Sequence, residues 1–135
     1  MYEYFVREVK NVVDGDTIDV IIDLGFDIMF ASRVRLAGID TPESRTTDKA
    51  EKALGLEAKE YLKKHLKDAK SVVIRTEKMD SSEKYGRILG WVYVNGESES
   101  LNNKMINDGY AWGYLGETKI KDFDVLKKAR AKSGK

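Results

Sequence analysis

The sequence contains no cysteine, and it has one histidine and one proline among its 135 residues. The absence of cysteine excludes disulfides and thiolate metal sites, and a single histidine leaves zinc without its usual ligands. Neither charge dominates, because 24 Lys and Arg side chains against 23 Asp and Glu give a net charge of +1. This balance does not favour strong non-specific binding to nucleic acid, so phosphate recognition must depend on local clustering of basic side chains.

Long apolar runs are also missing, and no stretch is long enough to span a membrane. The N-terminal segment "MYEYFVREVK" lacks the basic start and apolar middle of a signal peptide. As given, the chain is therefore expected in the cytoplasm, and secretion stays open if a leader was removed.

A chain of this length suits a single domain with one core, and hydrophobic residues make up 41% of it. We expect one domain over residues 1–135, with a basic tail from about residue 127 that is a candidate for a mobile segment. A monomer without an obligate protein partner is expected.

Strand-like segments dominate the first three-fifths of the chain. Five of them are expected at residues 4–13, 17–23, 28–39, 71–76 and 87–94. Two apolar faces set the register of the second against the third: Ile18, Val20 and Ile22 on one strand, and Phe30, Val34 and Leu36 on the other. A turn near Gly25 joins these two strands.

Helical periodicity is clearest over residues 54–69, where apolar side chains recur at three- and four-residue steps. Two further helices are expected, at about 101–108, with Gly109 as its stop, and at about 121–131. Strands broken by a helix and followed by helices predict an α+β fold: a small closed five-stranded antiparallel barrel with about three helices.

Three short segments carry acidic and basic residues in patterns that suggest chemistry: "DGDT" (14–17), "RVRLAGIDTPE" (33–43) and "EKYGR" (83–87). Taken singly, each is explained by a turn or a hairpin loop. The expected register favours a shared site over three separate turns, because it puts Arg35 near Gly15 or Thr17 and next to Asp16.

Strict alternation would direct Asp16 into the core, where an unpaired carboxylate is very costly. We therefore expect a kink or bulge at Asp14-Gly15 that turns Asp16 outward, towards Arg35 and Asp40. Two acids held close repel each other unless a cation lies between them. Oxygen ligands from Asp16, Asp40 and a Thr41 carbonyl suit a hard ion such as Ca²⁺.

The order and spacing of these segments resemble the staphylococcal nuclease (thermonuclease) family, whose members form an OB-fold barrel. The resemblance covers roughly residues 10–112. It includes "GLEAKEYLKKHL" as the helix after the active-site loop and "SLNNKMINDGYAW" as the later helix. The motif "DGDT" alone is weak evidence for this family, whereas the ordered set of segments is strong evidence.

The resemblance implies calcium-dependent hydrolysis of phosphodiester bonds in DNA or RNA. Carried over position by position, it implies that Asp16, Asp40 and the backbone oxygen of Thr41 hold one Ca²⁺. Glu43 would then orient or deprotonate the attacking water.

The same resemblance implies that Arg35 and Arg87 bind the phosphate and stabilise the charge of the transition state. The chemistry suits these residue types independently. A phosphodiester is an anion that repels hydroxide, and arginine supplies planar, bidentate donors that lysine lacks. Pro42 fixes the turn that separates Asp40 from Glu43.

Subsidiary positions have competing interpretations. Lys84 and Tyr85 match residues that contact a terminal phosphate in the family, and equally fit a hairpin loop and a half-buried ring. Tyr114 is the nearest candidate for a nucleotide-contacting tyrosine, although the spacing after residue 109 differs from the family by about one residue. Trp112 is interpreted as packing rather than a base platform, and His65 as structural.

Other interpretations stay open. Asp40 followed by Glu57-Ala58-Lys59 matches the signature of magnesium-dependent restriction-type nucleases, but it falls on a helical stripe where that fold has a strand. A non-catalytic nuclease-like barrel that binds single-stranded nucleic acid is a second alternative. The run 44–52, "SRTTDKAEK", is interpreted as a mobile polar loop beside the site.

Overall fold

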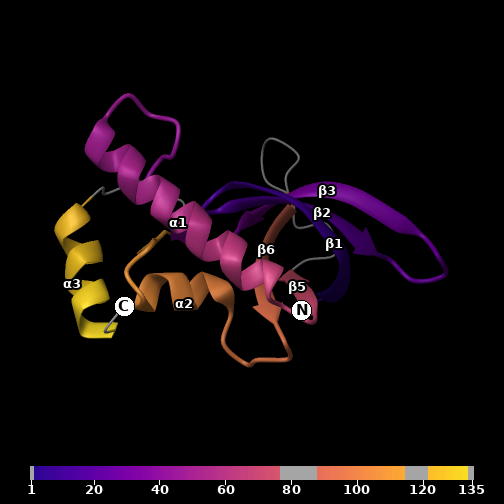
Figure 1. Ribbon diagram of the computed structural model, residues 1–135. Coiled ribbons are helices and arrows are strands. Elements are labelled where there is room, and N and C mark those ends of the chain that lie inside the picture. Colours follow the sequence, from indigo (N-terminus) through magenta and orange to yellow (C-terminus); the bar gives the residue numbers. More distant parts are fainter. Residues whose placement is uncertain (1, 77–87, 115–121, 134–135) are drawn as a thin grey trace.

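The computed structural model describes residues 2–76, 88–114 and 122–133. In chain order the elements are β1 (Tyr2–Asp14), β2 (Thr17–Asp23), β3 (Met29–Leu36), β4 (Ile39–Asp40), α1 (Lys49–Lys67), β5 (Val72–Thr76), β6 (Ile88–Val94), α2 (Leu101–Asn107), β7 (Trp112–Gly113) and α3 (Phe123–Ser133). The three helices gather on one side of the barrel, and the β2–β3 hairpin projects from the other (Figure 1). No helix in these described ranges is long and apolar enough to cross a membrane.

Five strands close into a barrel in the order β1-β2-β3-β6-β5, which confirms the predicted fold class. The barrel is mixed rather than wholly antiparallel, because β3 and β6 pair in parallel, with Val34 opposite Ile88 and Leu36 opposite Gly90. These two strands are not joined by a hairpin. The chain passes through α1 and β5 between them and returns in the same direction, as a parallel pair requires.

The predicted register of β2 against β3 is confirmed, with Thr17 opposite Arg35, Ile18 opposite Val34, and Ile22 opposite Phe30. The fully buried side chains of this ribbon line the barrel interior. They are Ile18, Val20, Ile22, Val34 and Leu36. Alternation along two strands therefore builds one wall of the core.

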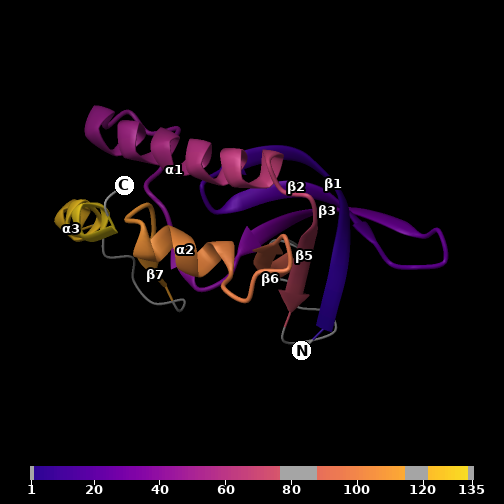
Figure 2. The same cartoon turned by 60° about the horizontal axis from the view of Figure 1, so that its bottom comes forward.

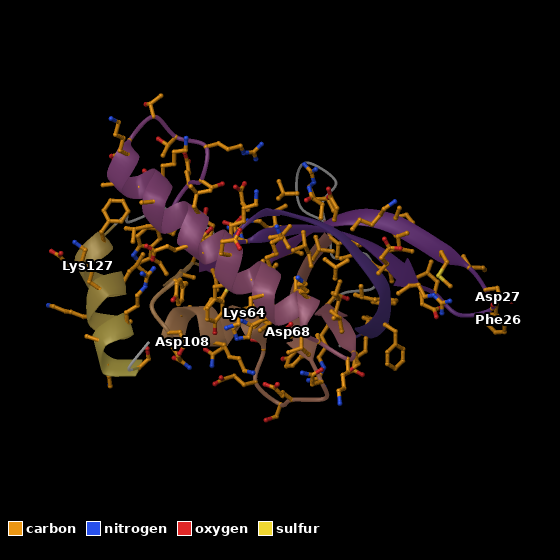
Figure 3. All side chains as sticks on the ribbon, viewed as in Figure 1. Phe26, Asp27, Lys64, Asp68, Asp108 and Lys127 are labelled. Atoms are coloured by element: carbon orange, nitrogen blue, oxygen red, sulfur yellow. The ribbon has the colours of Figure 1, made fainter. Side chains whose placement is uncertain are left out.

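Phe30 was expected on this core face, and that expectation is wrong, because 48% of its surface is exposed. The outer half of the hairpin extends past the barrel, where none of the described elements covers it (Figures 1 and 2). Phe26 and Asp27 lie at the far tip (Figure 3). An apolar face is buried only where a second layer faces it.

Helix α1 lies across the open end of the barrel beside the β1–β2 turn (Figure 2). Its apolar face buries Ala58, Leu62 and Leu66, as the periodicity predicted. The helix begins at Lys49, however, well before the expected start at residue 54. The interpretation of 44–52 as a polar loop is thus wrong for 49–52, and the side chain of Asp48 caps the helix by accepting from two backbone N–H groups.

Asn102 fastens α2 to the barrel. Its amide group donates to the carbonyl oxygens of Ala37 (2.7 Å) and Gly90 (3.2 Å), and its Oδ1 accepts from the Val92 N–H (3.0 Å). The residue is 2% exposed, so these bonds satisfy a polar side chain that would otherwise be costly to bury. They hold the end of β3 against β6, directly before the corner at 37–40.

A column of rings joins α1 to the C-terminal helix. Tyr61 stacks on His65 and contacts Tyr110, with ring centroids 4.1 and 4.6 Å apart, and the Arg130 guanidinium lies 4.1 Å from the Tyr110 ring. Nδ1 of His65 lies 2.8 Å from the Tyr61 carbonyl oxygen. His65 therefore packs within the fold, as the sequence predicted.

Within this column, the Tyr61 hydroxyl donates to Oδ2 of Asp108 at 2.7 Å. Burial, reinforced by this bond, raises the pKa of Tyr61 above its ordinary value of 10.0. The unfolded chain therefore releases the tyrosine proton first as the pH rises. The stability contributed by the neutral phenol is complete below pH 10.0 and is lost above it.

We predict that the free energy of unfolding falls above pH 10.0, in part because Tyr61 ionises more readily in the unfolded chain. Tyr61→Phe should remove this part of the decrease. One proton contributes a slope of at most about 1.4 kcal/mol per pH unit. Below pH 10.0 the variant should be about 1 kcal/mol less stable, because it lacks the bond to Asp108. Urea unfolding from pH 8 to 11 measures both effects. Equal alkaline slopes for the two proteins would contradict the assignment.

Candidate active site

The corner between β3 and β4 is built around the buried guanidinium of Arg35, which is 9% exposed. Nη1 donates to the carbonyl oxygen of Leu36 at 2.7 Å, and Nη2 donates to that of Ile39 at 2.8 Å. The guanidinium thus closes the backbone turn through charge-assisted bonds to both of its sides. A further backbone bond, from the Leu36 N–H to the Asp16 carbonyl oxygen at 2.8 Å, ties this corner to the β1–β2 turn.

Two carboxylates lie beside the same guanidinium nitrogen. Nη2 of Arg35 is 3.6 Å from Oδ2 of Asp16 and 3.7 Å from Oδ1 of Asp40. Both acids are largely shielded from solvent, with side chains 14% and 6% exposed. Strong local attraction therefore offsets the repulsion between the two acids.

Asp16 reaches this position by a tight turn, because Asp14 pairs with Thr17 and leaves only Gly15 and Asp16 between the strands. The expected bulge at Asp14-Gly15 lies slightly earlier, where the register shifts between Val12 and Asp14. The role of Gly15 is close approach. A Cβ there would lie 2.8 Å from Cβ of Ala58, closer than real Cβ atoms come.

Asp40 is fixed by the short β4–β7 sheet, in which it pairs with Trp112 while Ile39 pairs with Gly113. Trp112 is 8% exposed and donates its Nε1–H to the carbonyl oxygen of Asp122 at 2.9 Å. The interpretation of Trp112 as packing is therefore confirmed. The segment after α2 supports the back of the site through backbone pairing.

Hydroxyl groups orient the Asp16 carboxylate. Thr17 donates to its Oδ1 at 2.9 Å, and Thr41 donates to its Oδ2 at 3.2 Å. The sequence pointed to the Thr41 backbone oxygen as a ligand, whereas the contact visible here is made by the side chain. Thr17 was not predicted as a site residue, although a threonine directly after a turn acid is well placed to hold that acid.

A pocket of about 300 Å³ opens over these groups. It is lined by Asp14, Asp16, Thr17, Arg35, Asp40, Thr41, Pro42, Glu43, Ser44 and Arg45. Five of the residues predicted from sequence therefore share one pocket, and Asp14, Ser44 and Arg45 join it without having been predicted. Asp14 binds both of the other two, accepting from the Ser44 hydroxyl and from Nη2 of Arg45 at 3.1 Å.

The donor set of this pocket suits a hard cation. Two convergent carboxylates and threonine oxygens are ligands that Ca²⁺ prefers, and oxygen-only sites exclude the softer metals. Among the residues that the structure describes, no group of three or more His, Asp or Glu side chains could hold a metal ion. Asp16, Asp40 and Thr41 could contribute oxygen ligands to a cation only if water or substrate oxygens completed its shell.

Glu43 lies at the pocket's outer wall, with its side chain exposed and its backbone fixed. Its N–H donates to Oε2 of Glu51 at 3.1 Å. Glu51 is 7% exposed and was not predicted as a site residue. The pattern Asp48-x-x-Glu51 is a capping-box signature, which would have predicted both the helix start and an oriented carboxylate.

Several predicted residues lie elsewhere. Lys84, Tyr85 and Arg87 fall outside the described residues. Tyr114 follows β7, where its N–H donates to the carbonyl oxygen of Gly38 at 2.8 Å. It is not among the described residues that line the pocket.

The restriction-type alternative is disfavoured by the fold. Glu57 and Lys59 lie within α1, where that signature requires a strand. The Glu57 carboxylate pairs with the Arg130 guanidinium of α3 instead of pointing towards Asp40. Glu57 thus serves the contact between α1 and α3.

Arg33, two residues before Arg35, provides a natural comparison. It binds Asp19 on the outside of the barrel through two bonds, of 2.8 and 3.1 Å, and half of its side chain is exposed. This hydrogen bonding holds the pKa of Asp19 below its ordinary value. Exposed pairs of this kind contribute at most about 1 kcal/mol.

We predict that Arg35→Lys lowers the free energy of unfolding by about 1.5–3 kcal/mol, because one ammonium cannot reproduce the bonds to Leu36 and Ile39. Arg33→Lys should cost less than about 1 kcal/mol. Urea unfolding of the two variants measures the difference. Equal losses would show that the corner does not depend on the guanidinium.

Comparison with known proteins places this site in context. Residues 33–135 match the family model described as staphylococcal nuclease homologue. A protein named ParB from Escherichia coli is 34% identical over 95% of the chain, and thermonuclease from Staphylococcus intermedius is 38% identical over 76%. Micrococcal nuclease from Shigella flexneri is 35% identical over 82%.

The chain spans 68%, 56% and 59% of the lengths of these three relatives, in the same order. The matched region includes the Arg35 corner, Glu43, α1 and all later elements. With this match and the mixed five-stranded barrel, the chain belongs to the staphylococcal nuclease family.

Proposed function

We propose that this protein is a calcium-dependent nuclease that hydrolyses phosphodiester bonds of DNA or RNA. The observation that carries the proposal is the meeting of Asp16, Asp40 and Arg35 in one pocket whose outer wall includes Glu43. Family membership supports the same activity, since two of the relatives are named as nucleases.

In this proposal Asp16, Asp40 and Thr41 hold one Ca²⁺, which when bound supplies positive charge against the phosphate oxygens. Arg35 contributes on the inner side of the pocket. Its two bonds to carbonyl oxygens use two of the five N–H donors of a guanidinium, and its charge stays buried beside the acids. Positive charge fixed in a poorly solvated site stabilises an oxyanion without reorganising when the reaction occurs.

Glu43 is proposed to accept a proton from the attacking water or to orient that water. Glu43 is exposed and lines the pocket, so its carboxylate is proposed to bind a water molecule next to a bound phosphate. Arg87 is proposed to bind the phosphate from the other side. Lys84, Tyr85 and Tyr114 are proposed to contact more distant parts of the nucleotide.

The reaction then follows from charge and position. A phosphodiester anion repels hydroxide, and Arg35 and Arg87 would reduce this repulsion before attack, with a bound cation adding positive charge. As the water oxygen bonds to phosphorus and its proton passes to Glu43, negative charge grows on the phosphate oxygens that Arg35 and Arg87 contact. The P–O ester bond on the opposite side then breaks, and the leaving oxygen takes a proton from solvent. The barrel supplies the rigidity that holds these groups in place.

We predict that the protein degrades heat-denatured DNA with calcium, cuts little with magnesium and does not cut with chelator. Arg87→Ala should lose at least about 10²-fold in rate, the scale for a lost transition-state donor. Glu43→Gln should lose about 10²- to 10⁴-fold, the scale for a lost general base. A gel assay of fragment length at equal protein concentration measures this.

Arg33→Ala is the matched control, because it removes a surface arginine that binds Asp19 outside the pocket. It should cut like the unaltered protein. Cleavage that persists with chelator, or undiminished cleavage by the two site variants, would count against the assignment. Binding of DNA without any cleavage would favour a non-catalytic module.

A further inference from the structure

We infer that Glu51 and Gly55 of α1 are positioning residues that fix the backbone of Glu43, and so aim its carboxylate. The inference rests on the proposed role of Glu43. Neither residue lines the pocket among its described walls, so neither is proposed to contact substrate. They act through the segment Pro42–Ser44, which α1 contacts at its first two turns.

The first contact is the carboxylate of Glu51. The side chain of Asp48 satisfies the free N–H groups of Ala50 and Glu51, at 3.0 and 3.2 Å. A glutamate three residues after a cap commonly turns back to the N–H of the cap residue. Oε2 of Glu51 instead accepts the Glu43 N–H at 3.1 Å, in a site where Glu51 is 7% exposed. A buried, charge-assisted bond of this kind holds one backbone unit in a single orientation.

The second contact is steric, at Gly55. A Cβ at this position would lie 2.4 Å from the Glu43 carbonyl oxygen and 2.6 Å from the Ser44 nitrogen, distances that real Cβ atoms essentially never show. Glycine in a helix interior is unfavourable relative to alanine, so local helix stability does not explain it. The absence of a side chain lets the backbone of 43–44 lie directly on the helix.

A third contact holds the segment from the opposite side. The Asp14 carboxylate accepts from the Ser44 hydroxyl and from the Arg45 guanidinium. The backbone at 43–44 is therefore held between the first turns of α1 and the end of β1. Glu43 itself is exposed and lines the pocket, so fixing its backbone limits the positions that its carboxylate can take there.

The placement matters because proton transfer to a positioned carboxylate is sensitive to small displacements. Loosening the Glu43 backbone should lower kcat more than it raises KM. A residue that only stabilises the fold would instead leave the kinetics of the folded protein unchanged at temperatures far below unfolding.

The test compares Glu51→Ala with Glu51→Gln, whose amide oxygen can still accept the Glu43 N–H. Steady-state kinetics on a short DNA should show kcat reduced about 10- to 100-fold in Glu51→Ala with KM changed little, and largely restored in Glu51→Gln. Gly55→Ala should also lower kcat. Glu60→Ala, on the exposed face of α1, should match the unaltered protein. Thermal unfolding identifies any variant that fails to fold at the assay temperature.

Amide hydrogen exchange supplies a readout that needs no catalysis. The Glu43 N–H should exchange at least about tenfold faster in Glu51→Ala and remain protected in Glu51→Gln. An inactive unaltered protein would refute the proposed function and leave this comparison intact. Full kcat in Glu51→Ala beside an inactive Glu43→Gln, or unchanged exchange at Glu43, would overturn the positioning role and leave the function standing.

Discussion

The buried guanidinium of Arg35 is the interaction on which the site depends. It closes the turn between β3 and β4 by binding the carbonyl oxygens of Leu36 and Ile39. The same group lies within 4 Å of the carboxylates of Asp16 and Asp40. The positive charge of Arg35 therefore has two roles. It completes the backbone geometry of the turn, and it lets two acids share a poorly solvated pocket. The fold and the proposed chemistry thus depend on the same side chain.

The barrel and its helices bring the other residues of the pocket close to the Arg35 guanidinium. Pairing of Thr17 with Arg35 delivers the β1–β2 turn, and Asn102 holds the end of β3 to β6 just before the corner. Close packing then fixes the outer wall. Gly15 lies against Ala58, and Gly55 lies against the segment that carries Glu43. A single helix therefore contacts both the turn with Asp16 and the segment with Glu43.

Much of this arrangement follows from sequence patterns. Alternation along 17–23 and 28–36 was enough to fix the register, and the register was enough to put Arg35 beside Asp16. The parallel pairing of β3 with β6 was not predictable, because the two segments lie far apart in the chain and periodicity gives no direction. The exposure of Phe30 was missed for a related reason. Alternation indicates which side chains share one face of a strand, but it does not indicate where the layer packed against that face ends.

The contacts that hold the backbone of Glu43 were the least accessible from sequence. Glu51 was included in a polar run whose charges usually face solvent, whereas helix capping by Asp48 directs it inward. The role of Gly55 depends on a close approach between backbones, which no residue pattern encodes. The capping-box spacing could have indicated Glu51, whereas a close approach such as that at Gly55 becomes predictable only when the packing partner is known.

The proposed function requires that one pocket bind a cation and a phosphodiester together, so that each ligand strengthens the binding of the other. Calorimetry on the Glu43→Gln protein tests this requirement directly. A deoxydinucleotide is titrated into the protein with and without calcium, and calcium is titrated with and without the dinucleotide. We predict that each ligand lowers the dissociation constant of the other by the same factor, as linkage requires, and that this factor is at least about fivefold. Independent binding of the two ligands, or no binding of calcium at all, would contradict the account.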